Sequence, residues 1–312
     1  MPPHAGHLHL LAVAQRQVDE LSVVLFSKPR EPIPGTLRLA WLRELLPGAA
    51  VFHVERDHQV DFDDPDAWDF WVSAIRDVLP SDPTLVFSSE AYGEELARRL
   101  GASHVLVDPQ RCQVPITATQ IRKRPLAHWD YIPPPVRPYF VRRVAILGAE
   151  STGKTTLARA LADRFQTVWV PEYAREYLSA RAQPCTRDDM LRIAHGQAAS
   201  EDGLARQANR LLICDTDVLT TQIWHERYFG DCPPELRDLA AQRVPDLCLL
   251  CDADVPWEAD GIRDSPGQRP WFQERFRQAL KSRDGRTVIL SGPHERRLAA
   301  AIGAVEELLA EQ

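Results

Sequence analysis

Short apolar runs alternate with longer amphipathic stretches along the whole chain. The apolar runs occupy residues 21–27, 49–54, 83–89, 104–108, 142–148, 167–170, 210–217, 246–252 and 286–292. Continuous apolar runs of this length are typical of strands that are buried on both faces. The stretches with helical periodicity lie between them, at residues 37–46, 66–79, 93–100, 155–165, 190–208 and 271–283. This alternation predicts an α/β fold with mostly parallel sheets, in which ligands bind beyond the carboxyl ends of the strands.

A proline-rich segment interrupts this alternation at residues 128–140. Four of the six residues from 133 to 138 are proline, which cannot continue a helix or a central strand. We therefore predict a stiff connector of extended backbone in this segment. The predicted organisation is two doubly wound parallel-sheet domains, at residues 1–130 and 141–312, joined by a linker at residues 131–140.

Composition and charge narrow the class of protein. The 312 residues are 44% hydrophobic and 26% charged, as in ordinary globular proteins. No apolar run approaches the ~20 residues of a membrane span, and the first residues lack the pattern of a secretory signal, so we expect a cytoplasmic protein. The net charge of −7 is shared between residues 1–140 (−4) and the remainder (−3), which argues against a basic nucleic-acid-binding surface.

The six cysteines are too few for a disulfide scaffold, so reduced thiols are expected. Cys248 and Cys251 are the one close pair, and they lie within an apolar run. Because zinc sites in proteins need four ligands, a buried strand is favoured here over a metal or redox site.

The segment GAESTGKTT, residues 148–156, matches the phosphate-loop motif G-x-x-x-x-G-K-[ST]. An apolar run precedes it and a helical stretch follows it, as the motif requires. We expect Lys154, one of only four lysines, to reach the β- and γ-phosphates of ATP and Thr155 to ligate Mg²⁺. The other residues expected to bind this ATP are Gly148, Glu150, Ser151, Thr152, Gly153 and Thr156.

Two aspartates follow the apolar run at residues 210–217. Residues spaced by two on a strand point the same way, so Asp215 and Asp217 are both expected to face the phosphate loop. One would hold Mg²⁺, a role we assign to Asp215, and the other would accept a proton from a substrate hydroxyl. The alternative is that the pair only caps the next helix.

The absence of an Asn-Lys-x-Asp motif weakens a GTPase reading and favours a small-molecule kinase. Such kinases close an arginine-bearing lid over the transferring phosphoryl group. The segment at residues 259–270 has the composition of a lid, with Arg263 and Arg269 as candidates that would contact ATP.

The segment PEYAREY, residues 171–177, follows a short apolar run. Its position predicts that it lies at the carboxyl edge of the sheet, where an acceptor substrate would bind. Glu172, Tyr173 and Arg175 are therefore candidate substrate-binding residues. An exposed helix start is the alternative interpretation.

A second candidate site begins at the histidine pair of HAGH, His4 and His7. Gly6 permits close approach to a ligand, and two imidazoles at a helix N-terminus can donate to phosphate oxygens. Taken alone, the pair is equally consistent with a metal pair, a tag remnant or a disordered end. Thr117, Thr119 and Arg122 open another predicted helix and also suit a polyphosphate, so together the two segments favour nucleotidylyl transfer.

These two segments resemble the nucleotidylyltransferase superfamily, and residues 88–122 resemble the nicotinamide-nucleotide adenylyltransferase domain of NadR-type proteins. The second half is similar, in motifs and in their order, to the ribosylnicotinamide kinase domain of the same proteins: ILGAESTGKTTL, PEYAREY, DTDVLTTQIW and WEADGIR. The resemblance covers nearly the whole chain. It implies a Rossmann-like nucleotidylyltransferase domain followed by a P-loop kinase domain.

The resemblance also implies a bifunctional enzyme of NAD synthesis and salvage. The kinase domain would phosphorylate nicotinamide riboside with ATP and Mg²⁺, and the first domain would join the resulting nicotinamide mononucleotide to the AMP part of ATP. By this resemblance His4 and His7 contact the phosphates of the transferase ATP, and Thr119 and Arg122 hold its β- and γ-phosphates. We place Trp257 near the adenine or the nicotinamide ring.

The chain departs from the family pattern at its start. The family motif has a strand and a Gly-Lys-Phe-like turn before the proline that corresponds to Pro2. This chain has neither, so we expect either that the true start lies upstream or that the transferase domain lacks one central strand. No counterpart of the helix-turn-helix of some relatives is expected, and hence no DNA binding. Two alternatives stay open: a kinase with a degenerate first domain, and a regulator that binds NAD or ATP without turnover. No sequence feature indicates an oligomeric state.

Overall fold

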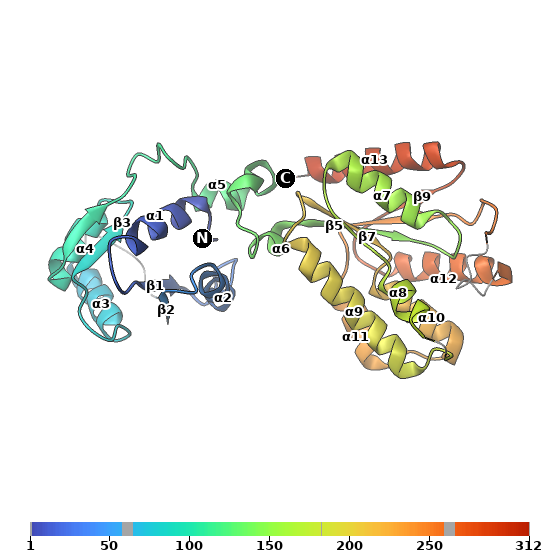
Figure 1. The fold of residues 1–312 in the computed structure, drawn as a ribbon, viewed down its shortest axis with the longest axis horizontal. Helices are drawn as coiled ribbons and strands as arrows, with labels where there is room; N and C mark the ends of the chain where they lie inside the picture. Colours follow the sequence, from blue (N-terminus) through green and yellow to red (C-terminus); the bar gives the residue numbers. More distant parts are fainter. Residues whose placement is uncertain (1, 58–64, 182, 259–265, 312) are drawn as a thin grey trace. The chain divides into compact units, whose positions relative to one another are not determined.

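The computed structural model describes residues 2–57, 65–181, 183–258 and 266–311. The chain forms two compact units, Met1–Val136 and Arg137–Gln312, and each combines strands with helices (Figure 1). All pairings between named strands are parallel, which confirms the predicted α/β class with parallel sheets. No described helix is both long and apolar enough to cross a membrane.

The first unit contains α1 (Ala5–Gln15), β1 (Ser22–Ser27), α2 (Gly35–Leu45), β2 (Ala50–Glu55), α3 (Pro65–Arg76), β3 (Leu85–Ser88), α4 (Tyr92–Leu100), β4 (Ser103–Leu106), α5 (Ala118–Lys123) and a 3-10 helix, η1 (Leu126–Tyr131). Strand β1 pairs with β2, and β3 pairs with β4. Within the described residues these are two separate two-stranded sheets, whereas we predicted one sheet. Side chains of β1 and β3 nevertheless join one apolar cluster with α3 and α4.

The second unit contains α6 (Arg137–Phe140), β5 (Arg142–Leu147), α7 (Lys154–Phe165), β6 (Trp169–Val170), α8 (Tyr173–Ser179), α9 (Arg187–Ala205), β7 (Leu211–Asp215), α10 (Val218–Phe229), α11 (Pro234–Gln242), β8 (Leu247–Cys251), η2 (Pro266–Gln268), α12 (Arg269–Lys281), β9 (Arg286–Leu290) and α13 (His294–Ala310). Its sheet has the strand order β6-β7-β5-β8-β9. The first strand of the unit therefore lies at the centre, with later strands on both sides of it. The loop after this central strand is where a doubly wound sheet binds its ligand.

Alternate residues of β5 enter two different cores, which shows that helices cover both faces of this sheet. Val144 and Ile146 pack with α7 and α13, whereas Ala145 and Leu147 pack with α10 and α12. The side-chain alternation of a strand requires this division when both faces are covered. The doubly wound architecture predicted for the second half is confirmed.

The neighbouring strand β8 carries the close cysteine pair. Cys248 and Cys251 are 2% and 0% exposed, and burial raises the pKa of Cys248 to about 12 and that of Cys251 to about 11. Both thiols are therefore uncharged at neutral pH, as expected of a buried strand rather than of a metal or redox site.

The proline-rich segment is not the extended connector that we predicted. It runs from the last residues of η1 through α6, and between these helices Val136 N donates to Pro133 O at 2.9 Å in a tight turn. Pro138 falls in the first turn of α6, where a helix does not need a backbone N–H. Ile132 and Val136 are 1% and 0% exposed, so apolar side chains between the prolines anchor the segment in a core.

Candidate active site

The phosphate loop follows β5 at the centre of the sheet. Gly148, Ser151 and Gly153 have φ values of +139°, +57° and +81°, which curl the backbone back on itself. A side chain at Gly148 would meet the carbonyl oxygen of Cys251 at 2.7 Å, so the loop requires glycine there. Helix α7 begins at Lys154, and its positive end faces the centre of the loop together with the loop amides. This is the geometry that holds a phosphate.

Thr155 and Asp215 meet beside this loop, at the carboxyl edge of the sheet. The Thr155 hydroxyl donates to Asp215 Oδ2 over 2.5 Å, and Lys154 Nζ donates to Ala149 O over 2.9 Å. Asp215 ends β7 and is 1% exposed. Burial raises the pKa of Asp215, while the nearby Lys154 charge and the Thr155 hydrogen bond act to lower it.

The oxygen atoms of this pair fit magnesium. Hydroxyl and carboxylate oxygens are ligands that Mg²⁺ prefers, and Asp215 Oδ1 is a buried acceptor with no hydrogen-bond partner among the described residues. No group of three or more His, Cys, Asp or Glu side chains in the described part of the chain could hold a metal by itself. Phosphate oxygens would therefore have to complete the coordination, as they do in phosphate-loop proteins.

Asp217 does not join Asp215, and the expectation that both carboxylates face one site was wrong. Thr216 has a φ of +72°, so the strand geometry ends between the two aspartates and their side chains diverge. Asp217 instead caps α10 by accepting from Thr220 N at 3.2 Å, and it pairs with Arg283 Nη1 at 2.7 Å. The helix-capping interpretation is thus the correct one for Asp217.

Replacing Asp217 by alanine is therefore expected to act on stability. Both partners are buried, with side chains 6% exposed for Asp217 and 9% for Arg283, and breaking a buried ion pair by removing one partner costs about 3–5 kcal/mol. Urea unfolding should show this loss, and the double variant Asp217→Ala/Arg283→Met should recover part of it. A stable Asp217→Ala protein that cannot transfer a phosphoryl group would restore the catalytic interpretation.

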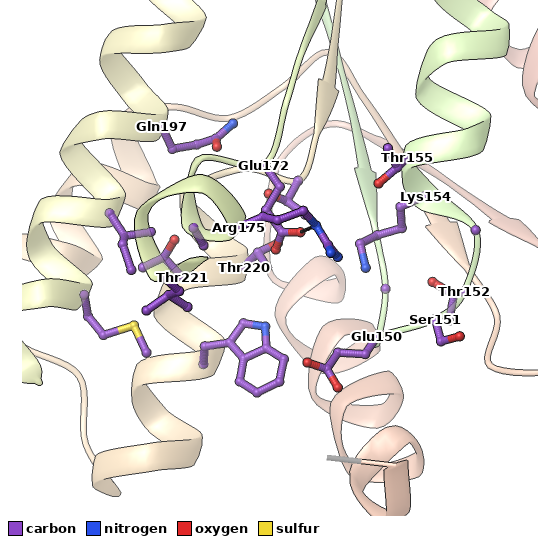
Figure 2. Close-up of a pocket in the computed structure, with 18 of the residues that line it drawn as sticks. Glu150, Ser151, Thr152, Lys154, Thr155, Glu172, Arg175, Gln197, Thr220 and Thr221 are labelled. Carbon is purple, nitrogen blue, oxygen red and sulfur yellow. Dashed lines mark ion pairs between the residues drawn. The ribbon is translucent and has the colours of Figure 1, made fainter. Parts of the chain in front are cut away.

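A described pocket extends from the phosphate loop to helices α8, α9 and α10. It is lined by Gly148, Glu150, Ser151, Thr152, Gly153, Lys154, Thr155, Thr156, Glu172, Ala174, Arg175, Leu178, Met190, Ile193, Gln197, Thr216, Thr220, Thr221, Trp224 and Tyr228. Figure 2 shows Glu172 and Arg175 between the phosphate loop and a group formed by Gln197, Thr220 and Thr221. The pocket thus extends from the phosphate loop to a second group of side chains on α8, α9 and α10, which we call the acceptor side after the predicted role of Glu172 and Arg175.

Glu172 and Arg175 stand between these two sides. Their side chains form an ion pair of 3.8 Å, with Glu172 21% exposed, and Arg175 extends toward Lys154 (Figure 2). Arg175 is close enough to act on the pKa of buried Asp215, which it lowers. The two residues predicted to serve the acceptor therefore lie beside the phosphate-loop lysine.

The other predicted residues of this site have different positions. Tyr173 is not among the described lining residues of the pocket. Its ring packs against Gly196 of α9, where a Cβ would lie 2.1–2.5 Å from the ring atoms. Trp257 likewise lies outside the lining, in a segment that touches the loop where Glu258 N donates to Ser151 Oγ at 2.8 Å. Arg263 falls outside the described residues.

Arg269, which was predicted to contact ATP, is not among the lining residues of the pocket, and neither is Arg297. Arg269 Nη1 donates to Val255 O at 2.9 Å, which ties the start of α12 to the segment after β8. Arg297 of α13, which sequence reasoning missed, is 4% exposed and donates to Thr152 O at 2.9 Å. A buried guanidinium therefore supports the phosphate loop from a helix more than a hundred residues away in sequence.

Of the residues on the acceptor side of the pocket, only Glu172 and Arg175 were predicted from the sequence. Met190, Ile193 and Gln197 repeat at the spacing of one helix face, and so do Thr220, Thr221, Trp224 and Tyr228. The periodicity was available in the sequence. The direction in which each helix face points could not be predicted, because it depends on how α9 and α10 pack beside the sheet.

In the first unit, His4 and His7 lie at the start of α1, where His4 Nδ1 accepts from Gly6 N at 3.1 Å. Their ring centroids are 3.9 Å apart. A Cβ on Gly6 would lie 3.7 Å from Ile116, so the chain just before α5 passes beside α1. The helix that carries the histidine pair therefore starts beside Ile116, which directly precedes Thr117, the N-cap of α5.

The segment around α5 has the expected helix start. Thr117 caps α5 and forms a capping box with Gln120, and Arg122 Nη2 donates to Thr119 Oγ1 at 3.1 Å. Arg111, a residue that sequence reasoning missed, donates to Ile116 O at 3.1 Å. Its charge lowers the pKa of both His4 and His7, so Arg111 adds a cation to this cluster.

Burial, followed by neighbouring positive charge, lowers the pKa of His4 from 6.5 to about 3 and that of His7 to about 4. Between these values and 6.5 the unfolded chain binds more protons than the folded chain, so stability falls as pH drops through this window. Each histidine should shift the unfolding equilibrium by up to roughly tenfold per pH unit. Protection factors for hydrogen exchange in α1, corrected for the intrinsic exchange rate at each pH, should fall on acidification, and His4→Gln should weaken this dependence. An unchanged pH dependence in that variant would contradict the assignment.

The central-strand phosphate loop, the doubly wound sheet and the Thr155–Asp215 pair define a P-loop nucleotide-binding protein. Residues 143–297 match a family model described as an AAA domain. Across 335 aligned positions the chain is 32% identical to the "Trifunctional NAD biosynthesis/regulator protein NadR" of Salmonella typhimurium, covering all of this chain and 82% of the relative. The protein of the same name from Escherichia coli K12 is 32% identical over 337 positions, with the same coverage. The chain belongs to the NadR family.

Two solved structures agree with this assignment. A crystal structure of a NadR protein in complex with NR superimposes with a TM-score of 0.82 at 26% identity, covering 100% of this chain and 94% of that one. A crystal structure of a NadR protein in complex with NAD and AMP-PNP gives a TM-score of 0.80 at 26% identity and the same coverage. The similarity therefore extends over both units.

Proposed function

We propose that the second unit phosphorylates the 5′-hydroxyl of nicotinamide riboside with ATP, and that the first unit joins the product, nicotinamide mononucleotide, to the AMP part of ATP. The observation that carries the kinase proposal is the single pocket that runs from the phosphate loop to the Glu172–Arg175 pair. The complexes of related NadR proteins with NR, and with NAD and AMP-PNP, support the choice of substrates.

The phosphate side of the pocket would hold ATP. The loop amides and Lys154 surround the β- and γ-phosphates, and Thr155 and Asp215 would hold Mg²⁺, directly or through water, which supplies positive charge to the phosphate oxygens when bound. Arg175, which extends toward Lys154 (Figure 2), is placed to stabilise charge on the transferring phosphoryl group. Catalysis here is positioning and charge stabilisation, with no covalent enzyme intermediate.

On the acceptor side, Glu172 lines the pocket and would accept the hydroxyl proton. The 5′-oxygen would attack the γ-phosphorus as its proton passes to Glu172, and the bond from that phosphorus to the leaving ADP oxygen would break. Asp217, the earlier candidate for this role, is occupied by Arg283 and the start of α10. This leaves Glu172 as our choice of base.

The aromatic rings of Trp224 and Tyr228 suit the nicotinamide end of the acceptor. Their ring centroids are 5.3 Å apart on α10, and both rings line the pocket with Glu150. The nicotinamide ring of the riboside is a pyridinium cation, which aromatic faces and a carboxylate both attract. We place the ring of the substrate at this end and its 5′-hydroxyl at Glu172.

For the first unit, the neutral His4 and His7 rings, Arg111 and the start of α5 would bind the triphosphate of a second ATP. Neutral imidazoles still donate one N–H each, and the guanidinium of Arg111 supplies charge. The mononucleotide phosphate would attack the α-phosphorus, and pyrophosphate would leave.

One observation favours a second candidate function, a kinase whose first unit has lost adenylyl transfer. The described part of the first unit contains two separate two-stranded sheets, and a nucleotide site of the Rossmann type depends on adjoining strand ends. The kinase proposal does not depend on the outcome for the first unit.

The test is a product assay on the purified chain with Mg²⁺. Nicotinamide riboside and ATP should give nicotinamide mononucleotide and ADP, and the mononucleotide and ATP should give NAD and pyrophosphate, each resolved by chromatography. The first reaction without the second would identify the kinase-only protein. Neither reaction, with nucleotide binding retained, would identify a nucleotide-sensing regulator.

A further inference from the structure

Gln197 connects the acceptor side of the pocket to a buried polar network behind it. The residue lies on α9, is 2% exposed and lines the pocket (Figure 2). We infer that Gln197 is a positioning residue whose side-chain amide holds the start of α8, and thereby the Glu172–Arg175 pair, against the phosphate loop. This inference rests on the proposed role of that pair.

The contact is with the first residue of α8. Gln197 Oε1 accepts from Tyr173 N at 3.0 Å, and Tyr173 directly follows Glu172, the N-cap of the helix. An amide N–H in the first turn of a helix has no partner within its own helix. A side chain of α9 therefore supplies the missing acceptor and sets where α8 begins.

Glu201 contacts the other end of the Gln197 amide. It lies one turn further along α9, is 3% exposed, and accepts from Gln197 Nε2 at 3.4 Å. Arg243 holds the other oxygen of Glu201 with Nη2 at 3.0 Å. Because the backbone N–H of Tyr173 can only donate, the oxygen of the Gln197 amide must face it, and the NH₂ group is left to face Glu201.

Gly196 provides a second constraint on the position of Tyr173. A Cβ at this position would lie 2.1–2.5 Å from atoms of the Tyr173 ring, so the ring lies directly against the backbone of α9. Tyr173 is thus held by its N–H and by its ring, both from consecutive residues of α9. The position of Glu172 relative to the phosphates then follows from the packing of α8 on α9, and a shift of about 1 Å at a reacting group costs up to ~10²-fold in rate.

The experiment compares Gln197→Leu with a matched control, Gln278→Leu. Gln278 also donates to a glutamate one turn away on its helix, Glu274 at 3.0 Å, but both lie exposed on α12. We expect Gln197→Leu to lower kcat for riboside phosphorylation by roughly 10- to 100-fold, with KM for ATP within about twofold, and Gln278→Leu to be unchanged. A kcat of Gln197→Leu equal to that of the control would overturn the inference.

A second variant, Gln197→Glu, separates positioning from a general loss of packing. The new carboxylate still offers an acceptor to Tyr173 N, but it faces Glu201. Burial raises the pKa of Glu201 to about 7, although the charge of Arg243 acts to lower it. Asp217 and the Cys214 thiol are the other titratable groups that act on Glu201 or respond to it. Near pH 6 the two glutamates should share a proton and restore much of kcat, and near pH 8 they should repel each other and lose it.

A Gln197→Glu activity with the same pH profile as the parent protein would contradict the inference, and this comparison still applies if Gln197→Leu does not fold. Glu172→Gln is measured in parallel. If Glu172→Gln retains full activity, the proposed function of the pair fails. If Glu172→Gln is defective while both Gln197 variants are normal, only the positioning role fails.

Discussion

Replacing Lys154 by alanine is expected to reduce riboside phosphorylation by roughly 10²- to 10³-fold while leaving any adenylyl transfer intact. Lys154 is the first residue of α7 and lines the pocket at the phosphate loop, where its charge would act on the phosphates of ATP. Alanine is a good helix former, so the helix should persist without the charge. The two activities would reside in separate compact units, and only one of them contains this lysine.

The measurement is the rate of ADP and mononucleotide formation, alongside the rate of NAD formation from the mononucleotide. Lys281→Ala is the matched control, since Lys281 is an exposed lysine in the last turn of α12. Loss of both reactions in a folded Lys154→Ala protein would contradict the model of two separate sites.

Replacing Glu172 by glutamine is expected to lower kcat for phosphorylation by roughly 10²- to 10⁴-fold, the range for loss of a general base. The amide keeps the size of the side chain and can still contact Arg175, which lies 3.8 Å from the carboxylate. It cannot accept the hydroxyl proton. ATP affinity should change little, because Glu172 faces the acceptor side.

The control is Glu176→Gln, an exposed carboxylate one turn along the same helix. Both variants should be compared by kcat, by KM for each substrate and by the pH dependence of kcat, whose acid limb should disappear in Glu172→Gln. Equal kcat values for the two variants would remove Glu172 from the chemistry and leave it a structural role.

The parts of the site that could be predicted are those that depend on neighbours in sequence. The phosphate loop was predicted because Gly148 and Gly153 allow a backbone that other residues resist, and because a strand and a helix flank them. The Cys248–Cys251 strand was predicted from its apolar run alone. Thr155 meets Asp215 because a phosphate loop after one parallel strand adjoins the carboxyl end of the next.

The predictions were wrong where a contact between residues distant in sequence, or an unexpected backbone angle, overrode a rule based on neighbouring residues. The spacing of Asp215 and Asp217 predicted one direction for both, and the positive φ of Thr216 separated them. Tyr173 was expected to line the pocket, but its ring packs against Gly196, which is distant in sequence. The prolines predicted an extended linker, but the segment forms a turn in which the side chains of Ile132 and Val136 are buried.

The sequence by itself determined the α/β class, the phosphate loop and the family, since each depends on residue types at fixed spacing along the chain. Only the tertiary structure decided which side chains line the pocket, which aspartate lies beside the phosphate loop, and that Gln197 contacts Tyr173 and Arg297 contacts Thr152. The physical reason is that helical periodicity defines a face but not its direction. That direction is set by the packing of α8, α9, α10 and α13 around the sheet.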